Sequence, residues 1–335
     1  MKEALYYKEY EDRKVRCRLC PRKCVIAPGK RGDCGVRENR DGILYSLVYG
    51  KPCSVAVDPI EKKPLFHFFP GTTSYSIGTA GCNLHCLNCQ NWTTSQVKPE
   101  EVVNYGIEPK ELVKMAVKSG CRSISYTYNE PTIFFEYVLD TARIAREKGI
   151  KNVMVTNGFI NKEPAKELYE YIDAANVDLK AFSEEFYRKY CFAELKPVLG
   201  LLKLIKEMNV WVEITNLIIP TLNDDFDLIK KMCLWVKENM GVEVPVHFSR
   251  FYPSYKLSYI QPTTEKTLLK AKETAVSVGI KYVYIGNTRM PNAENTYCPK
   301  CKKLLVERTA FTVNQNNLDK GACKFCRERI SGVWG

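Results

Sequence analysis

The most constraining feature of this chain is a regular alternation of strand-like runs and amphipathic helical stretches that begins near residue 74. Six short apolar or alternating runs follow one another along the sequence, at residues 74–80, 123–131, 151–159, 175–182, 210–220 and 245–253. Amphipathic stretches such as 109–120 and 264–279 separate them, and several end in glycine, as helix C-caps do. Repeated βα units predict a parallel sheet. Six units, with 282–286 as an extra strand, fall short of a closed eight-fold barrel, so we expect an α/β fold with a partial (β/α)6 barrel over 74–290.

Cysteine-rich segments flank this predicted barrel on both sides. Residues 1–45 carry four cysteines among Pro, Gly and Arg, and such a segment needs a bound metal to hold it together. Residues 46–73 have the pattern of short strands and turns leading into the barrel. Residues 291–335 hold two cysteine pairs around an alternating, hairpin-like segment. We therefore expect two small metal-binding modules, one at each end of the chain.

Composition narrows the class of protein and its surroundings. Lys or Arg interrupts each apolar stretch, and the N-terminus lacks the apolar region of a secretory signal, so the sequence predicts no membrane span and a cytoplasmic location. Fifteen cysteines in a reducing compartment indicate metal rather than disulfides. The net charge of +12 fits an acidic partner or nucleic acid, but charges of both signs alternate along the chain. A solvated surface is the simpler interpretation.

The C-terminal group is Cys298, Cys301, Cys323 and Cys326. Two CxxC pairs joined by a hairpin-like segment are a strong signature of four thiolates around one tetrahedral ion. A structural zinc ribbon is the favoured interpretation, and a rubredoxin-like iron or an auxiliary iron–sulfur cluster is the alternative.

The N-terminal group is Cys17, Cys20, Cys24 and Cys34, with spacing C-x2-C-x3-C-x9-C. It also supplies four thiolates, but this spacing identifies no particular metal. Zinc and an iron–sulfur cluster fit it equally well, and a redox-active CxxC fits it less well.

The central group has only three cysteines, Cys82, Cys86 and Cys89, spaced C-x3-C-x2-C directly after the first barrel strand. Barrel enzymes place their chemistry at this end of the strands. The isolated Cys53, Cys121, Cys191 and Cys233 lie at no recognisable ligand spacing, and we interpret them as small buried apolar residues. An incomplete ligand set indicates a metal site that is left open for a substrate.

These three cysteines resemble the hallmark of the radical S-adenosylmethionine (SAM) superfamily, C-x3-C-x-Φ-C after the first strand of a partial barrel. One departure is Asn88, which stands at the usually aromatic position of the motif that meets the adenine. Further segments narrow the resemblance to one group within this superfamily: CRLCPRKC, YSLVYGKP, DPIEKKPLFHFFPGT, CQNW, YTYNEPT and VTNGF. They are similar to the radical enzyme of the AmmeMemoRadiSam system, a relative of the pyruvate formate-lyase and other glycyl-radical-enzyme activases.

The resemblance implies a [4Fe–4S] cluster on the three central cysteines, with SAM completing the coordination of the fourth iron. It implies reductive cleavage of SAM to a 5′-deoxyadenosyl radical that abstracts hydrogen from a substrate, with reduced flavodoxin or ferredoxin as electron donor. It further implies a protein or peptide substrate and partner proteins of AMMECR and Memo type. Oxygen must be excluded from such chemistry.

Polar side chains also gather at the carboxyl ends of the predicted strands, where buried strands are normally apolar. Such unpaired charges are costly, so together they predict a ligand site. The candidates are Glu130, Thr156, Asn157, Asp178, Lys180, Glu213, Thr215 and His247. By resemblance, Glu130 accepts a hydrogen bond from the SAM ammonium group, Asn157, Glu213 and His247 contact its ribose or methionyl part, and Asp178 and Lys180 match the DxK pattern of activases. His67 and His85 have no such support and are interpreted as surface or core residues.

Two further functions fit parts of the sequence. An activase that installs a glycyl radical on a large partner is a version of the same chemistry. An RNA-binding or RNA-modifying metalloprotein fits the basic charge and the cysteine modules, but no RNA-binding module is evident. A purely structural zinc protein leaves the three-cysteine site unexplained.

Overall fold

The computed structural model describes residues 1–335, and its centre is an eight-stranded sheet. Seven parallel strands follow the chain in order, β8 (Thr73–Gly78), β9 (Ser123–Tyr126), β10 (Lys151–Thr156), β11 (Ala174–Asp178), β12 (Trp211–Ile218), β13 (Val246–Arg250) and β14 (Val283–Gly286). A further strand, β7 (Ser54–Pro59), pairs antiparallel with β8. The two edges, β7 and β14, do not pair with each other, so the sheet stays open. The expected partial barrel is confirmed, and residues 282–286 supply its seventh parallel strand.

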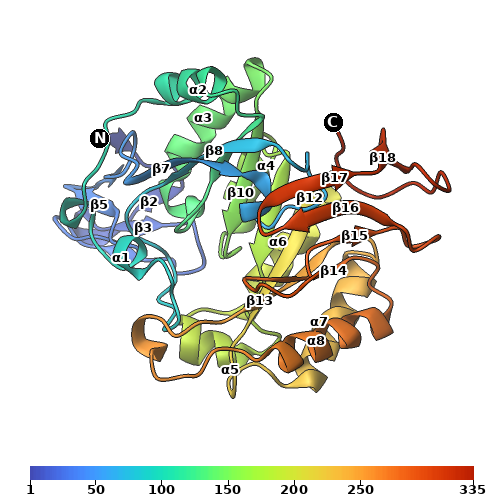
Figure 1. Ribbon diagram of the computed structural model, residues 1–335. Coiled ribbons are helices and arrows are strands. Elements are labelled where there is room, and N and C mark those ends of the chain that lie inside the picture. The colour runs from blue at the N-terminus through green and yellow to red at the C-terminus, as the bar shows by residue number, and fades with distance from the viewer.

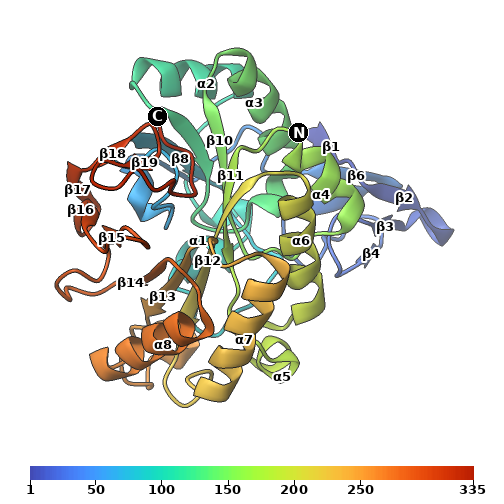
Figure 2. The ribbon, with the colours of Figure 1, turned by 90° about the vertical axis from the view of Figure 1, so that its right-hand side faces the viewer.

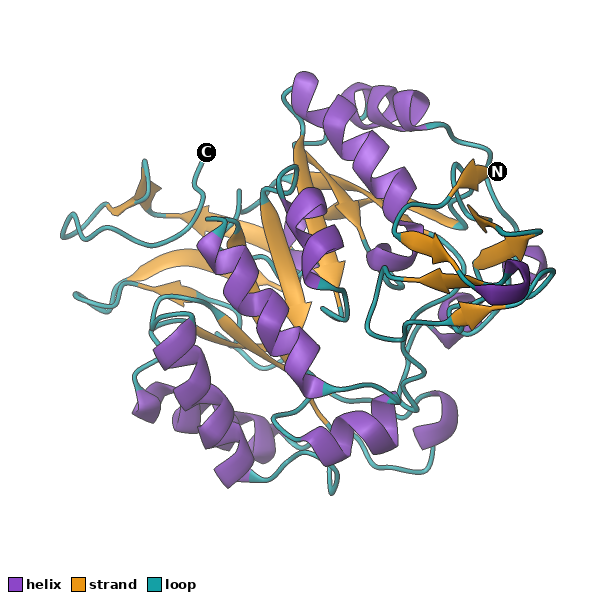
Figure 3. Ribbon diagram, turned by 180° about the vertical axis from the view of Figure 1, so that it is seen from behind, coloured by secondary structure: helices purple, strands orange, loops and turns teal.

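The helices that connect the strands cover one face of this sheet (Figure 3). They are α2 (Pro109–Lys118), α3 (Phe135–Glu147), α4 (Lys162–Tyr169), α6 (Leu195–Glu207), α7 (Phe226–Asn239) and α8 (Glu265–Val278). Because each parallel strand neighbours the next one in sequence, right-handed crossovers put every helix on the same side. Shorter helices, α1 (Trp92–Ser95), α5 (Glu184–Phe186) and a π-helical turn (Tyr187–Cys191), lie in the loops. The other face of the sheet is left free for the interior of the barrel.

The interior is closed at the amino-terminal ends of the strands by residues 60–69, called the inner segment below. Its apolar side chains Ile60, Leu65 and Phe68 pack against Val153 and Ala174, which lie early in β10 and β11. Single 3-10 turns, such as Ile60–Lys62, let this segment turn inside the barrel. The carboxyl ends of the strands remain open above it.

The N-terminal module consists of two small sheets. One contains β1 (Lys2–Glu3), β6 (Ile43–Ser46) and β5 (Arg37–Arg40), and the other contains β2 (Tyr7–Glu9), β3 (Val15–Cys17) and β4 (Val25–Ile26). A buried ion pair between Arg37 and Glu136 joins this module to α3. Figures 1 and 2 show the module beside α3 and α4, on the opposite side of the barrel from the C-terminal module.

The C-terminal module contains β15 (Thr296–Tyr297), β16 (Leu304–Thr309) and β17 (Thr312–Asn316) in one sheet, and the hairpin of β18 (Leu318–Asp319) and β19 (Ala322–Cys323). The chain end then pairs with the inner segment, because the Val333 N–H donates to the His67 carbonyl and the Val333 carbonyl accepts from the Phe69 N–H. The module therefore covers the closed end of the barrel. No helix of the protein is both long and apolar enough to cross a bilayer.

Candidate active site

A cavity of about 400 Å³ opens at the carboxyl ends of the strands. That volume lies within the range of sites for small organic ligands. Ten of the twelve side chains expected in the central site line it: Cys82, Cys86, Asn88, Cys89, Glu130, Thr156, Asn157, Asp178, Lys180 and Thr215. Residues from β8 through β12 and the loops that follow them are thereby brought to one place.

The three central cysteines lie on the loop between β8 and α1. The Leu84 N–H lies 3.4 Å from the Cys82 sulfur, and the Ser95 hydroxyl lies 3.1 Å from the Cys89 sulfur. The three sulfurs do not all lie within 4.8 Å of one another. One ion needs sulfurs closer than this, whereas each thiolate of an iron–sulfur cluster binds a separate iron. The three-thiolate donor set therefore fits a [4Fe–4S] cluster better than a single ion.

Electrostatics of the same loop also fit a positively charged metal group. Burial raises the pKa of Cys82 well above its usual value, and the nearby Glu130 carboxylate adds to the effect. A thiolate at this position is unfavourable unless a cation offsets it, and metal coordination deprotonates a thiol outright.

Cys191 is a residue of this site that the sequence did not reveal. It is fully buried at the end of the π-helical turn, and a hydrogen bond from its thiol lowers the pKa of Cys86 to about 7. A main-chain hydrogen bond holds the two segments together, because the His85 N–H donates to the Cys191 carbonyl. Its position in the sequence, 102 residues after Cys89, gave no signal of proximity.

Glu130 lies fully buried at the start of the turn after β9. Its Oε1 accepts from Thr132 N–H at 2.9 Å and from the Thr156 hydroxyl at 2.8 Å. Its Oε2 accepts from Asn157 N–H at 2.7 Å. Burial raises the pKa of Glu130. Because a carboxylate can accept about four hydrogen bonds, one position on Oε2 stays free to accept from a ligand in the cavity.

Asp178 and Lys180 form an ion pair across the cavity wall, with 2.9 Å between Oδ2 and Nζ. Burial lowers the pKa of Lys180, but the negative charges of Asp178 and of thiolates at Cys86 and Cys191 raise it well above its usual value. The Lys180 ammonium is therefore held as a cation next to the cysteine loop. Both side chains line the cavity.

The structure puts Glu213 and His247 elsewhere, and their interpretation as cofactor contacts is corrected here. Neither residue lines the cavity. Glu213 Oε1 accepts from His67 N–H and Trp211 Nε1, and Oε2 accepts from Phe66 N–H. His247 Nε2 lies 2.7 Å from the same Oε2. All four acceptor positions are used, so this carboxylate anchors the inner segment and has none left for a ligand.

Lys62 and Lys63 are cavity residues that the sequence analysis did not single out. Lys63 pairs with Asp58 at 2.6 Å, and Tyr128 also donates to Asp58. Although burial would raise it, the hydrogen bonds from Lys63 and Tyr128 hold the pKa of Asp58 well below its usual range. Burial lowers the pKa of Lys63 to about 8. The signal that could have found them is the pair of adjacent lysines in the stretch DPIEKKPLF, between Pro59–Ile60 and Pro64–Phe66.

His67 and His85 lie in the core and at the surface of the cysteine loop, respectively. His67 is fully buried, with its ring nitrogens 2.6 Å from the Ser331 carbonyl and the Tyr284 hydroxyl. His85 is half-buried and lies 2.9 Å from Asp33 in the N-terminal module. Neither ring lines the cavity.

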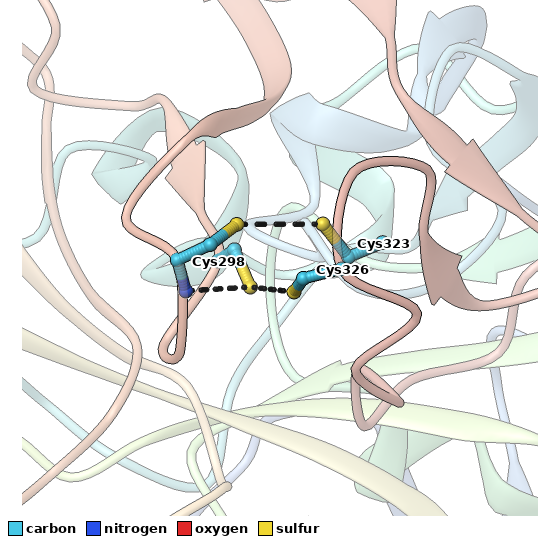
Figure 4. A group of neighbouring side chains, drawn as sticks. Cys298, Cys323 and Cys326 are labelled. Atoms are coloured by element: carbon cyan, nitrogen blue, oxygen red, sulfur yellow. Dashed lines mark hydrogen bonds between the residues drawn. The ribbon is translucent and has the colours of Figure 1, made fainter.

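The four C-terminal cysteines converge as expected, with the Cys298–Cys326 and Cys301–Cys323 sulfurs 3.6 and 3.7 Å apart (Figure 4). They are the only set of three or more candidate metal ligands in which all ligand atoms lie within 4.8 Å. Zn–S bonds of about 2.3 Å give sulfur separations of about 3.8 Å around a tetrahedral ion. The geometry fits one four-coordinate metal ion.

The fold and this site define a class of protein. Residues 76–233 match the radical SAM superfamily, so this part of the chain is a radical SAM domain. Members use a [4Fe–4S] cluster together with SAM, for which the three cysteines and the cavity provide a fitting site.

Individual relatives extend over different shares of the chain. An uncharacterized protein of Methanocaldococcus jannaschii is 50% identical over 335 residues, which is 99% of this chain and 100% of that protein. A GTP 3′,8-cyclase of Thermodesulfovibrio yellowstonii is 30% identical over 51% of this chain and 53% of its own length. A pyruvate formate-lyase-activating enzyme of Clostridium pasteurianum is 23% identical over 54% of this chain and 81% of its own length.

Solved structures agree with the fold. SuiB of Streptococcus suis bound to S-adenosylmethionine superposes with a TM-score of 0.51 at 14% identity, over 72% of this chain and 56% of that one. At this identity the likeness supports the architecture of the barrel alone.

Proposed function

We propose that this protein is an enzyme that reductively cleaves SAM and uses the resulting 5′-deoxyadenosyl radical to abstract hydrogen from a protein or peptide. The observation that carries the proposal is the meeting of the three central cysteines with Glu130 and Lys180 around one cavity. When bound, a [4Fe–4S] cluster supplies the electron that splits the sulfonium into methionine and the radical. The residues of the chain bind, orient and shield these groups.

Each side chain has a task that follows from its contacts. Cys82, Cys86 and Cys89 hold the cluster. The free acceptor position of Glu130 suits the SAM ammonium group, and its three hydrogen bonds keep the carboxylate fixed in orientation. The Lys180 ammonium, held charged beside the cysteine loop, suits the SAM carboxylate or an anionic part of the substrate.

The size of the cavity supports a substrate whose bulk stays outside it. A volume of about 400 Å³ is at the low end for organic ligands, so a cluster with SAM leaves little room for a second whole molecule. A protein or peptide can insert one side chain or one backbone segment from the open mouth. The likeness to a pyruvate formate-lyase-activating enzyme is consistent with this class of substrate. Partner proteins of AMMECR or Memo type remain our candidates for the substrate.

We also propose zinc for the four C-terminal cysteines. Their sulfur separations of 3.6 and 3.7 Å suit a single ion, and the site lies at the closed end of the barrel, away from the cavity. A closed four-thiolate site has no open position for chemistry, so the ion acts by holding the module together.

The test is anaerobic reconstitution with iron and sulfide, followed by incubation with dithionite and SAM. We expect 5′-deoxyadenosine from the wild type and only background from Cys82→Ala. No difference between the two proteins would overturn the proposal. With a candidate partner added, a stable glycyl radical seen by electron paramagnetic resonance would identify an activase, and a mass change without such a radical would identify a different modification. Consumption of GTP instead would place the enzyme with the cyclases.

A further inference from the structure

The four N-terminal cysteines surround a small cavity of their own. Cys17 ends β3, Cys20 follows in the next turn, Cys24 precedes β4 and Cys34 precedes β5, and all four line the cavity. No three of their sulfurs lie within 4.8 Å of one another, in contrast to the C-terminal set. One tetrahedral ion requires sulfurs about 3.8 Å apart, whereas the thiolates of a [4Fe–4S] cluster bind four different irons around a shared core. The spacing thus favours a cluster over zinc.

Hydrogen-bond donors point at these sulfurs as they do at metal-bound thiolates. Asp33 N–H lies 3.4 Å from the Cys24 sulfur, and the Arg37 guanidinium lies 3.8 Å from the Cys17 sulfur. Such donors stabilise thiolates and tune the potential of an iron–sulfur centre.

Two arginines that line the cavity have buried donors without a partner. Arg37 is 1% exposed, and its Nε makes no hydrogen bond. Nη2 of Arg22 is also buried and unpaired. A buried donor on a charged group that makes no hydrogen bond is unfavourable, so an acceptor is expected inside the cavity. A cluster bound there would supply sulfides that can accept from these donors, whereas a lone zinc ion would offer no acceptor.

The cavity shares a wall with the central cysteine loop. Gly81, which directly precedes Cys82, has a φ of +88°, and a Cβ on it would lie 2.5 Å from the Cys34 carbonyl oxygen. Nε of Arg22 donates to the Asn83 carbonyl at 3.0 Å. Asn83 lines the N-terminal cavity, and its side chain accepts from Asn157, which lines the active site. Residues 81–83 therefore link the N-terminal cavity to the central cysteine loop.

We propose that Cys17, Cys20, Cys24 and Cys34 hold an auxiliary [4Fe–4S] cluster that relays electrons to the central cysteine loop. A one-electron donor of the flavodoxin or ferredoxin class reduces the auxiliary cluster by one electron, and that electron then passes to the central cluster, so the auxiliary cluster returns to its oxidised state. No proton or bond changes in this step. The relay rests on the proposed function, but the identity of the cluster does not.

Measuring the metal content tests the auxiliary cluster and the central cluster separately. Iron, sulfide and zinc are measured per chain after anaerobic reconstitution for the wild type, a Cys82/Cys86/Cys89 triple alanine variant and a Cys20/Cys24 double alanine variant. Two clusters predict about eight irons in the wild type and about four in each variant, with zinc unchanged. A triple variant that lacks iron and holds an additional zinc would overturn the auxiliary cluster. A double variant that lacks iron altogether would instead count against the proposed function, because it would leave no central cluster. Cys53→Ala, outside every group, is the control for thiol loss.

A milder variant guards against misfolding of the module. Arg22→Gln keeps all cysteines and removes the positive charge at the cavity wall. We expect full iron content and a lower midpoint potential for the cluster that remains in the triple alanine background, measured by redox titration with electron paramagnetic resonance. An unchanged potential would contradict the position of Arg22 against a cluster.

The relay has its own readout, which is the rate of reduction of the central cluster. In the Cys20/Cys24 double variant, reduction by flavodoxin or ferredoxin is expected to slow at least about tenfold, while reduction by dithionite, a small molecule that reaches the cavity directly, stays unchanged. Equal slowing with both reductants would indicate a damaged active site, and no slowing with either would show that electrons bypass the auxiliary cluster. Either result would overturn the relay.

Discussion

The carboxylate of Glu213 accepts a hydrogen bond from the main-chain N–H of His67, 2.7 Å away across 146 residues of sequence. This contact fastens the inner segment to β12, and His247 completes the arrangement from β13. Although burial would raise it, the hydrogen bond from His247 lowers the pKa of Glu213 below its usual value. The closed end of the barrel is thus held by a charged group that its own chain satisfies fully.

We predict that Glu213→Ala lowers the free energy of unfolding by about 3–5 kcal/mol, because breaking a buried charged network leaves its partners unpaired. Urea unfolding followed by tryptophan fluorescence, under anaerobic conditions, measures this change. The matched control is Glu273→Ala on the exposed face of α8, for which we expect a change within about 0.5 kcal/mol. Equal changes at the two positions would show that the hydrogen bonds of Glu213 contribute no more to stability than an exposed side chain does.

Glu130→Gln tests the second buried carboxylate, which still has a free acceptor position. Replacing a charged hydrogen-bond partner of the SAM ammonium costs about 1.5–3 kcal/mol, so the dissociation constant for SAM should rise at least about tenfold. Anaerobic calorimetry on the reconstituted protein measures it, and the iron content should not change. Glu111→Gln, exposed on α2, is the control. Unchanged affinity in Glu130→Gln would assign this residue to the structure of the loop alone.

His67 and His85 predict opposite responses of stability to pH. Burial lowers the pKa of His67 to about 4, so below about pH 6.5 the unfolded chain binds a proton that the folded chain does not. Its contribution is present above about pH 6.5 and is lost as the pH falls toward 4, at up to about 1.4 kcal/mol per pH unit. The hydrogen bond with Asp33 raises the pKa of His85, so its contribution is present at low pH and is lost as the pH rises.

The measurement is the slope of unfolding free energy against pH between about 7.5 and about 5.5. His67→Gln should make this slope less positive, and His85→Gln should make it more positive. Because both variants keep the same carboxylates, the difference between them isolates the two imidazoles. A steeper positive slope in His67→Gln would contradict the assignment of a neutral buried ring.

The succession of strands could be predicted because buried parallel strands are short apolar runs that helices separate, and both patterns are local. The cavity could be predicted in large part for a related reason, since the carboxyl ends of parallel strands meet at one edge. The sequence did not predict how far along its strand a residue lies from the cavity. Glu213 and Thr215 share a face of β12, yet Thr215 lines the cavity while Glu213 lies two residues earlier and meets the inner segment.

Contacts between residues that lie far apart in the chain could not be predicted from the sequence either. Lys62 and Lys63 reach the cavity because the inner segment runs inside the barrel, and nothing in the βα alternation indicates that path. Cys191 reaches Cys86 through a π-helical turn between β11 and α6. Spacing identified three groups of cysteines, but only the structure shows that the sulfurs of the C-terminal group alone converge within 4.8 Å of one another.

The C-terminal metal gives the last prediction. Cys326→Ser should remove about one zinc per chain and leave the iron content unchanged, because this site lies away from the cysteines of the cavity. Structural zinc contributes folding free energy directly, so β15–β19 should become sensitive to limited proteolysis. Since Val333 pairs with His67 and Phe69, release of the tail should also loosen the inner segment and lower the stability of the barrel. Cys53→Ser is the matched control. Loss of iron together with zinc in Cys326→Ser would show instead that the C-terminal site and a cluster depend on each other.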